Sequence, residues 1–253
     1  MYLPIIMLHY VLDEPDQSIA AWSITRKKFL EMLDCVAQSN LQTVTFEEIV
    51  EQKFSADELK NKIVLTFDDC PVSLFDFAIP ELIKRKLKAV FYMPTAYLGK
   101  YNVWDVQDHS AFETPLMDAE LLKKLVELGM EVGSHSHHHV KLSTLTEKDS
   151  FFEITQSKSI LQEILHKPVY SIAYPYGEIP KNFKTSLDKA GYHFGLSIYS
   201  PHQHRFSLRR IGIYQYDTWK TMNFKMSRSY HLLRNIASPI RQVKKLITTK
   251  KRL

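Results

Sequence analysis

The sequence predicts an α/β fold in one domain, built on a parallel sheet or a barrel. Compact apolar strand patterns alternate with helical patterns about seven times along the chain. The 253 residues, 45% of them hydrophobic, suffice for one large core without disulfides or structural metals. No repeat of fixed period and no linker rich in Pro, Gly or Ser divides the chain, and two cysteines form no disulfide framework.

Each predicted element follows from a local pattern. Compact apolar or β-branched runs predict strands, apolar residues at helical spacing predict helices, and Thr45, Asp118 and Thr146 predict helix starts. The predicted strands span residues 3–11, 41–46, 62–67, 89–93, 130–133, 170–174, 194–198 and 208–214. The predicted helices span residues 25–38, 45–50, 73–86, 118–129, 146–165 and 180–190, and residues 99–117 are predicted to be loop.

The net charge of +5 is divided unevenly along the chain. The last acidic residue is Asp217, and residues 218–253 hold ten Lys or Arg. Residues 1–217 carry 23 bases against 28 acids, a net charge of −5. Because a nucleic-acid-binding protein is expected to present a basic face, this division argues against a nucleic-acid partner. It predicts a main domain over 1–217 and a basic helical tail over 218–253.

Neither end of the chain resembles a membrane span. No stretch reaches the roughly 18–20 apolar residues that a spanning helix needs, and the N-terminal apolar run lacks the basic flank and cleavage site of a signal peptide. We therefore expect a cytoplasmic protein. Two interpretations of the tail stay open: a final helix packed on the main domain with a frayed basic end, or a segment lying on anionic lipid at the inner face of the membrane.

Two adjacent carboxylates, Asp68 and Asp69, follow the buried strand at 62–67. The carboxyl ends of parallel strands are where α/β folds build their sites. Successive strand side chains point to opposite faces, but a bend at the strand end would bring both carboxylates to one site. One would then bind a metal while the other acts as a base. The alternative is a pair that caps the following helix.

Four histidines occur within five residues, at positions 135, 137, 138 and 139. Neutral imidazole is a common ligand of transition metals. His135 and His139 are four residues apart, so a helical turn or a compact loop would aim both at one ion. Together with Asp69 they form a set of two imidazoles and one carboxylate, which leaves coordination positions open as a catalytic site requires. The alternative is a polar loop with adventitious metal affinity.

Two further segments are candidates for the same site. The turn containing Pro175, Tyr176 and Gly177 would present a backbone N–H to an oxyanion, or is an ordinary turn. His9 lies in the first predicted strand, where it is either a hydrogen-bonded core residue or, if the strand ends at the same mouth, a general acid.

The motifs TFDD (66–69), HSxxH (135–139) and YPYG (174–177), in this order, resemble those of the polysaccharide deacetylases. These are the NodB-homology proteins of carbohydrate esterase family 4, and the resemblance extends over about residues 3–217. The His-Tyr pair ahead of the TFDD motif is similar to the poly-N-acetylglucosamine deacetylase branch. The resemblance implies a single-domain distorted (β/α)7 barrel that removes acetyl groups from N-acetylated sugars with the help of a divalent metal, most often zinc.

The resemblance also implies a role for each motif residue. Asp68 would be the general base and His9 the general acid. Asp69, His135 and His139 would bind the metal, and the backbone N–H of Tyr176, beside Pro175, would help to bind the oxyanion.

One position departs from the family pattern. Ala173 stands where the family usually has an Arg that contacts the base, and of Arg209 and Arg210 we expect Arg210 to replace it. Trp104, in the predicted loop, either stacks on a sugar ring or packs in the core. Two alternative functions stay open: a catalytically impaired carbohydrate-binding relative, and a hydrolase of a non-sugar amide on the same barrel. An iron(II) oxygenase is disfavoured, because such enzymes commonly place their ligands as H-x-D on a β-sandwich.

Overall fold

A computed structural model describes residues 3–104, 113–198, 200 and 204–234 of the chain. Its strands are β1 (Ile5–Leu8), β2 (Tyr10–Val11), β3 (Ser23–Ile24), β4 (Gln42–Thr43), β5 (Lys62–Asp68), β6 (Val90–Met93), β7 (Glu131–Ser134), β8 (Ser171–Ala173), β9 (Phe194–Ser197), β10 (Leu208–Arg209) and β11 (Ile211–Gly212). Its α-helices are α1 (Arg26–Gln38), α2 (Phe46–Glu51), α3 (Ala78–Lys84), α4 (Ala119–Glu127), α5 (Glu147–Leu165), α6 (Phe183–Lys189) and α7 (Trp219–Lys225).

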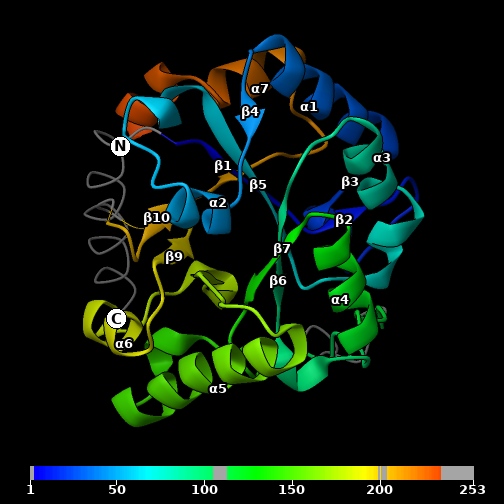
Figure 1. The fold of residues 1–253 in the computed structure, drawn as a ribbon. Helices are drawn as coiled ribbons and strands as arrows, with labels where there is room; N and C mark the ends of the chain where they lie inside the picture. Colours follow the sequence, from blue (N-terminus) through cyan, green and yellow to red (C-terminus); the bar gives the residue numbers. More distant parts are fainter. Residues whose placement is uncertain (1–2, 105–112, 199, 201–203, 235–253) are drawn as a thin grey trace, which may run out of the picture.

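The strands form a parallel sheet that curves nearly into a closed barrel, with helices around its outside (Figure 1). The strand order is β10-β9-β8-β7-β6-β5-β1-β11, with β4 paired to β5. β10 pairs with β9 and β11 pairs with β1, so the short segment 208–212 joins the two edges of the sheet. This arrangement confirms the predicted α/β barrel.

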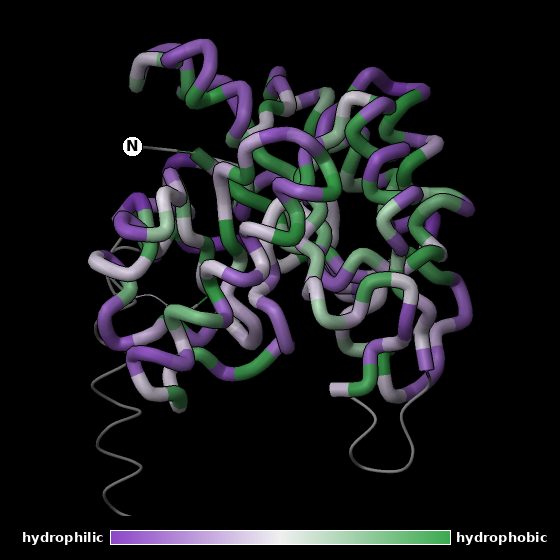
Figure 2. The backbone as a smooth tube through the Cα atoms, turned by 60° about the horizontal axis from the view of Figure 1, so that its bottom comes forward, coloured by the Kyte–Doolittle hydropathy of each residue, from purple (hydrophilic) through white to green (hydrophobic). Residues whose placement is uncertain are grey.

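Two hydrophobic clusters form the core, and strand alternation separates them. On β5, Ile63 and Leu65 belong to the larger cluster, which packs under the helices, whereas Val64 belongs to the smaller one. The smaller cluster includes Phe46 of α2, whose ring lies 4.8 Å from that of Phe194. Figure 2 shows hydrophobic and hydrophilic residues interspersed along the backbone, as expected of elements that each bury one side. By the same alternation, Asp68 falls on the side of β5 that carries Val64.

The helix starts follow the predicted caps. The Thr45 side chain accepts the Glu48 N–H and Glu48 returns a bond to the Thr45 N–H, which completes a capping box. The side chains of Asp118 and Thr146 cap α4 and α5 by accepting the N–H groups of Leu121 and Asp149. Each cap stabilises its helix by about 1 kcal/mol.

Three predicted elements are interrupted. The helix predicted over 73–86 is a 3-10 turn (Val72–Asp76) followed by α3, with a break at Phe77. A continuous helix would place Pro80 in its interior, where proline lacks the N–H and clashes with the preceding turn; the break puts Pro80 in a first turn, where both effects are tolerated. The strands predicted over 3–11 and 208–214 are interrupted at His9 and at Arg210.

The described part of the basic segment after Asp217 packs on the barrel. Met222 and Met226 are buried, and Ser39 of the α1 C-cap donates a hydrogen bond to Asn223 (3.0 Å). Residues 228–234 are also helical, while residues 235–253 lie outside the described residues. Within the described ranges, no helix is both long and apolar enough to cross a membrane.

Candidate active site

A cleft of about 250 Å³ opens at the carboxyl ends of the barrel strands. The cleft brings together every residue expected in the site except Pro175, which is buried in the adjoining 3-10 turn η7 (Pro175–Gly177). The other two histidines of the cluster, His137 and His138, do not line it. The lining residues are His9, Tyr10, Trp22, Asp68, Asp69, Trp104, His135, His139, Tyr174, Tyr176, Gly177, Ile198 and Arg210.

Asp69, His135 and His139 form a compact buried trio. Asp69 Oδ1 lies 3.6 Å from His135 Nε2 and 3.4 Å from His139 Nε2. His135 Nδ1 lies 2.7 Å from the Ala173 carbonyl; because a carbonyl only accepts, Nδ1 carries the proton and Nε2 is left with a lone pair facing Asp69. Burial lowers the pKa of both histidines, which keeps them neutral. Two neutral imidazoles and a carboxylate fit a divalent metal with open coordination positions.

Left-handed backbone conformations concentrate around this trio. Among the described residues, nine other than glycine have a positive φ, and those away from the cleft, such as Asn40 and His166, lie at helix C-termini. The remaining five lie in the three motifs or directly beside them: Asp69, Cys70, Ser136, His139 and Tyr176. Such conformations cost about 1–3 kcal/mol each and persist where the surroundings impose them. At Asp69 (φ 67°) the bend turns its carboxylate to the same site as Asp68.

Glu153 on α5 holds the histidine loop. Its buried carboxylate accepts the backbone N–H groups of His137 (2.9 Å) and His138 (2.7 Å), and it also contacts His138 Nδ1 (2.7 Å). The His137 ring in turn contacts the Thr95 hydroxyl (2.8 Å). His137 and His138 thus support the loop that carries His135 and His139. Sequence reasoning missed Glu153; its signal was a carboxylate on the buried stripe of a long helix.

Asp68 is held by Arg210 at the bottom of the cleft. The guanidinium makes two parallel hydrogen bonds to the carboxylate, 2.5 and 2.7 Å long, and both side chains are almost fully buried. Burial alone would raise the pKa of Asp68, but the charge of Arg210, with smaller contributions from His135 and His9, holds it well below its usual range. Asp68 is therefore an ionised carboxylate with a fixed orientation, and Arg210 makes the contact with it that was expected in place of an arginine at position 173.

His9 occupies the gap between β1 and β2 and faces Asp68. Its Nε2 lies 3.7 Å from Asp68 Oδ2, so it sits at the cleft rather than in the apolar core. Burial lowers its pKa to about 4, against the opposing effect of Asp68. The ring of Trp22, 46% exposed, lies 5.0 Å from the His9 ring. Sequence reasoning missed Trp22, which no local pattern distinguishes from an ordinary packing aromatic.

Aromatic rings also cover His139. Trp104 stacks on it with ring centroids 4.1 Å apart, and Tyr176 contacts it edge-on at 5.0 Å. Lys141 Nζ lies 5.2 Å from the centre of the Tyr176 ring. Trp104 therefore packs against a candidate metal ligand and also lines the cleft. These contacts restrict the orientation of the His139 imidazole.

Comparison with known proteins places this arrangement in a family. A family model described as polysaccharide deacetylase matches residues 55–195. The putative polysaccharide deacetylase YxkH of Bacillus subtilis is 25% identical over 197 residues, 77% of this chain and 64% of that protein. A poly-beta-1,6-N-acetyl-D-glucosamine N-deacetylase of Staphylococcus aureus is 22% identical over 191 residues, 72% of this chain and 63% of that protein. The chain thus matches just under two thirds of the length of these relatives.

Solved structures share the fold. The Streptococcus pyogenes deacetylase PplD, in complex with acetate, superposes with a TM-score of 0.74 and 22% identity over 89% of this chain and 98% of that one. IcaB from Ammonifex degensii superposes with a TM-score of 0.72 and 21% identity over 88% and 96% of the two chains. These matches confirm the predicted barrel of the NodB type. Because the family model covers more than half of the sequence, this chain belongs to the polysaccharide deacetylase family.

Proposed function

We propose that this protein is a metal-dependent hydrolase that removes the acetyl group from N-acetylated sugars. One juxtaposition carries the proposal: the Asp68–Arg210 pair and His9 share a single cleft with the trio Asp69, His135 and His139. Amide hydrolysis requires an activated water, a polarised carbonyl and a protonated leaving amine. This cleft holds groups suited to each requirement. The name of the Staphylococcus aureus relative supports a polymer of N-acetylglucosamine as the substrate class.

The trio would hold a divalent transition metal, and we propose zinc. Imidazole nitrogen and carboxylate oxygen in a three-ligand set are typical of catalytic zinc sites. The His135 hydrogen bond to Ala173 and the Glu153 contacts that fix the His139 loop are the kind of support that such ligands require. When bound, the ion polarises the acetyl carbonyl and lowers the pKa of a water molecule.

The chain's own groups would move the protons. Asp68, kept ionised and oriented by Arg210, accepts a proton from the attacking water, whose oxygen forms the new bond to the acetyl carbon. Because burial lowers the pKa of His9 to about 4, His9 would first have to take up a proton, and Asp68, 3.7 Å away and protonated by the water, would supply it. As the C–N bond breaks, His9 would pass this proton to the departing sugar nitrogen, and acetate is released. The backbone N–H of Tyr176, in the η7 turn at the cleft, would donate to the developing oxyanion. Trp22 and Trp104 offer aromatic faces for a sugar ring beside the reacting group.

Acetate release from N-acetylglucosamine oligomers tests the proposal directly. We expect release that a chelator abolishes and added Zn²⁺ restores, and release that persists in the chelator would refute the mechanism. Asp68→Asn should keep the metal and lose acetate release. The matched control is Asp188→Asn, which removes an exposed carboxylate paired with Arg205 on the surface and should leave release unchanged.

The alternatives from the sequence predict other outcomes of the same assay. A catalytically impaired relative would bind the oligomers without releasing acetate, but the Arg210–Asp68 pair removes the main reason for that reading, the alanine at 173. A hydrolase of non-sugar amides would release acetate from simple acetamides faster than from the oligomers.

A further inference from the structure

The barrel has a seam at Arg210. Arg210 lies between β10 and β11, which pair with different strands of the sheet: β10 pairs with β9, and β11 pairs with β1. The Arg210 N–H donates to the Ser197 carbonyl (2.9 Å), while the side chain enters the cleft and reaches Asp68. The backbone at the seam therefore sets the direction from which Arg210 approaches Asp68.

Arg234 reaches this seam from the basic segment that follows Asp217. Its Nη1 donates to the Arg210 carbonyl (2.6 Å), and its Nη2 donates to the Ile198 carbonyl (2.7 Å). One planar guanidinium thus joins the seam residue to the residue that follows β9. Both Arg210 and Ile198 line the cleft.

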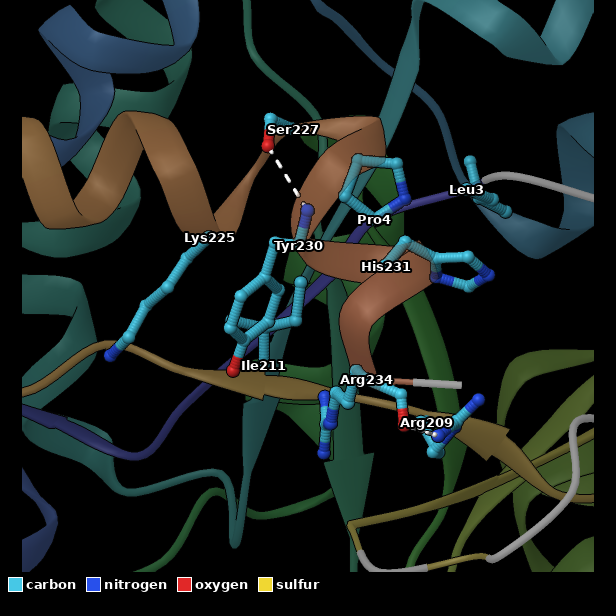
Figure 3. Close-up of a pocket in the computed structure, with 9 residues that line it drawn as sticks. All are labelled: Leu3, Pro4, Arg209, Ile211, Lys225, Ser227, Tyr230, His231 and Arg234. Carbon is cyan, nitrogen blue, oxygen red and sulfur yellow. Dashed lines mark hydrogen bonds between the residues drawn. The ribbon is translucent and has the colours of Figure 1, made fainter. Parts of the chain in front are cut away.

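Further contacts anchor Arg234 in place. Arg209 Nη1 donates to the Arg234 carbonyl (3.0 Å), and Lys225 Nζ donates to the Gly212 carbonyl (3.0 Å) at the end of β11. Figure 3 shows Arg234 and Arg209 together beneath the 228–234 helix, with Tyr230 between that helix and β11. The basic segment after Asp217 is therefore attached to the stretch 208–212 at three residues: Arg209, Arg210 and Gly212.

We propose that Arg234 is a positioning residue for catalysis, which holds the backbone at Arg210 so that Arg210 keeps Asp68 in its reactive orientation. Arg234 acts on Asp68 through Arg210, since it holds the Arg210 carbonyl while the Arg210 side chain binds Asp68. The proposal rests on the proposed deacetylase function, and it makes the segment after Asp217, as far as residue 234, part of the catalytic barrel. Because small displacements of catalytic groups are costly, we expect Arg234→Ala to lower kcat by about 10- to 100-fold with KM changed less than about twofold.

Two measurements on the full-length protein test this inference. The first is kinetic: kcat and KM for acetate release by Arg234→Ala, by Arg234→Lys and by the control Arg228→Ala, which removes a charge from an exposed position of the same helix. Lysine donates to one carbonyl but lacks the fork that joins two, so Arg234→Lys should fall between wild type and Arg234→Ala. The control should match wild type.

The second measurement does not depend on activity. The guanidinium N–H signals of Arg210 in ¹H–¹⁵N NMR spectra, assigned by their loss in Arg210→Lys, should shift or broaden in Arg234→Ala and stay unchanged in Arg228→Ala. An unchanged Arg210 signal, or a fall in kcat no larger than that of Arg228→Ala, overturns the inference. If wild type releases no acetate, the proposed function fails, while the Arg210 signal still decides whether Arg234 positions it. If Arg234→Ala does not fold, the same signal in Arg234→Lys decides.

Discussion

Glu153 provides a test of how the histidine loop is built, since it contacts the loop without being a ligand. The change is Glu153→Ala, compared with Glu153→Gln. In the alanine variant the partly buried backbone N–H groups of His137 and His138 lose their acceptor. A fully buried donor left unsatisfied costs about 1–3 kcal/mol. Because these two N–H groups are only partly buried, we expect a total loss of about 1–3 kcal/mol in the free energy of unfolding if the loop stays closed.

The loop has an alternative, which is to open and let water satisfy these N–H groups. Opening would displace His139, whose left-handed backbone (φ 52°) is imposed by its surroundings. The energetic cost would then appear as lost metal affinity, and removal of groups that support metal ligands typically lowers affinity by about 10- to 100-fold. Glu153→Gln keeps one carbonyl oxygen able to accept both N–H groups, so we expect it to lose much less of either quantity.

The assay is Zn²⁺ affinity by competition with a chromophoric chelator, together with urea unfolding of the metal-free protein. In Glu153→Ala the free energy of unfolding and the free energy of Zn²⁺ binding, added together, should fall by the loss calculated for the two N–H groups. In Glu153→Gln this total should stay within about 1 kcal/mol of wild type. Glu163→Ala, on the exposed face of the same helix, is the control. Unchanged affinity and unchanged stability in Glu153→Ala would refute the view that this carboxylate shapes the site.

Three further predictions address other parts of the molecule. Arg210→Lys should lower kcat by at least about tenfold while metal content is retained, because one ammonium cannot replace two parallel guanidinium bonds; equal kcat would contradict the role of the pair. Burial, with the charge of Glu47, raises the pKa of Glu131 from 4.5 to about 8. Between pH 5 and 8 the folded state then holds a proton that the unfolded state releases, so this group should lower the free energy of unfolding by up to about 1.4 kcal/mol per pH unit as the pH rises. In Glu131→Gln this contribution to the slope, measured by urea unfolding, should disappear. The full chain should float with anionic liposomes more than a chain ending at Arg234 does; equal flotation would rule out lipid binding by the last residues.

The sequence predicts the order of the elements well, because strand and helix periodicities and caps are local. Thr45, Asp118 and Thr146 start their helices as expected, since a cap depends on residues within one turn. The barrel itself came from the family resemblance. The breaks at His9 and Arg210 were not predicted, because whether a residue forms strand hydrogen bonds depends on which strands lie beside it. The same reason explains why Glu153 and Trp22 were missed: their contacts with His137, His138 and His9 join different elements, beyond the reach of one helical turn or one strand pattern.

The two adjacent arginines show how strand alternation and the basic segment combine. Arg210, in the break between β10 and β11, points into the cleft and meets Asp68, while Arg209, the last residue of β10, meets the Arg234 carbonyl. Neighbouring side chains of extended backbone point to opposite sides, so only one of the two arginines serves the carboxylate. Arg234 completes the chain of contacts by donating to the Arg210 carbonyl.

The basic residues after Asp217 therefore fall into groups with different roles. Lys225 neutralises Asp217 itself (2.6 Å) and holds the end of β11, and Arg234 holds the seam. The composition changes at Asp217 because the acids end there, whereas contacts with the barrel continue to residue 234. Of the ten bases, Lys225 and Arg234 contact the barrel, and six lie between residues 241 and 252, where the excess is densest. The membrane interpretation is tested on these six. A flotation difference should therefore survive Lys225→Gln and Arg228→Gln but vanish when these six are replaced by Gln.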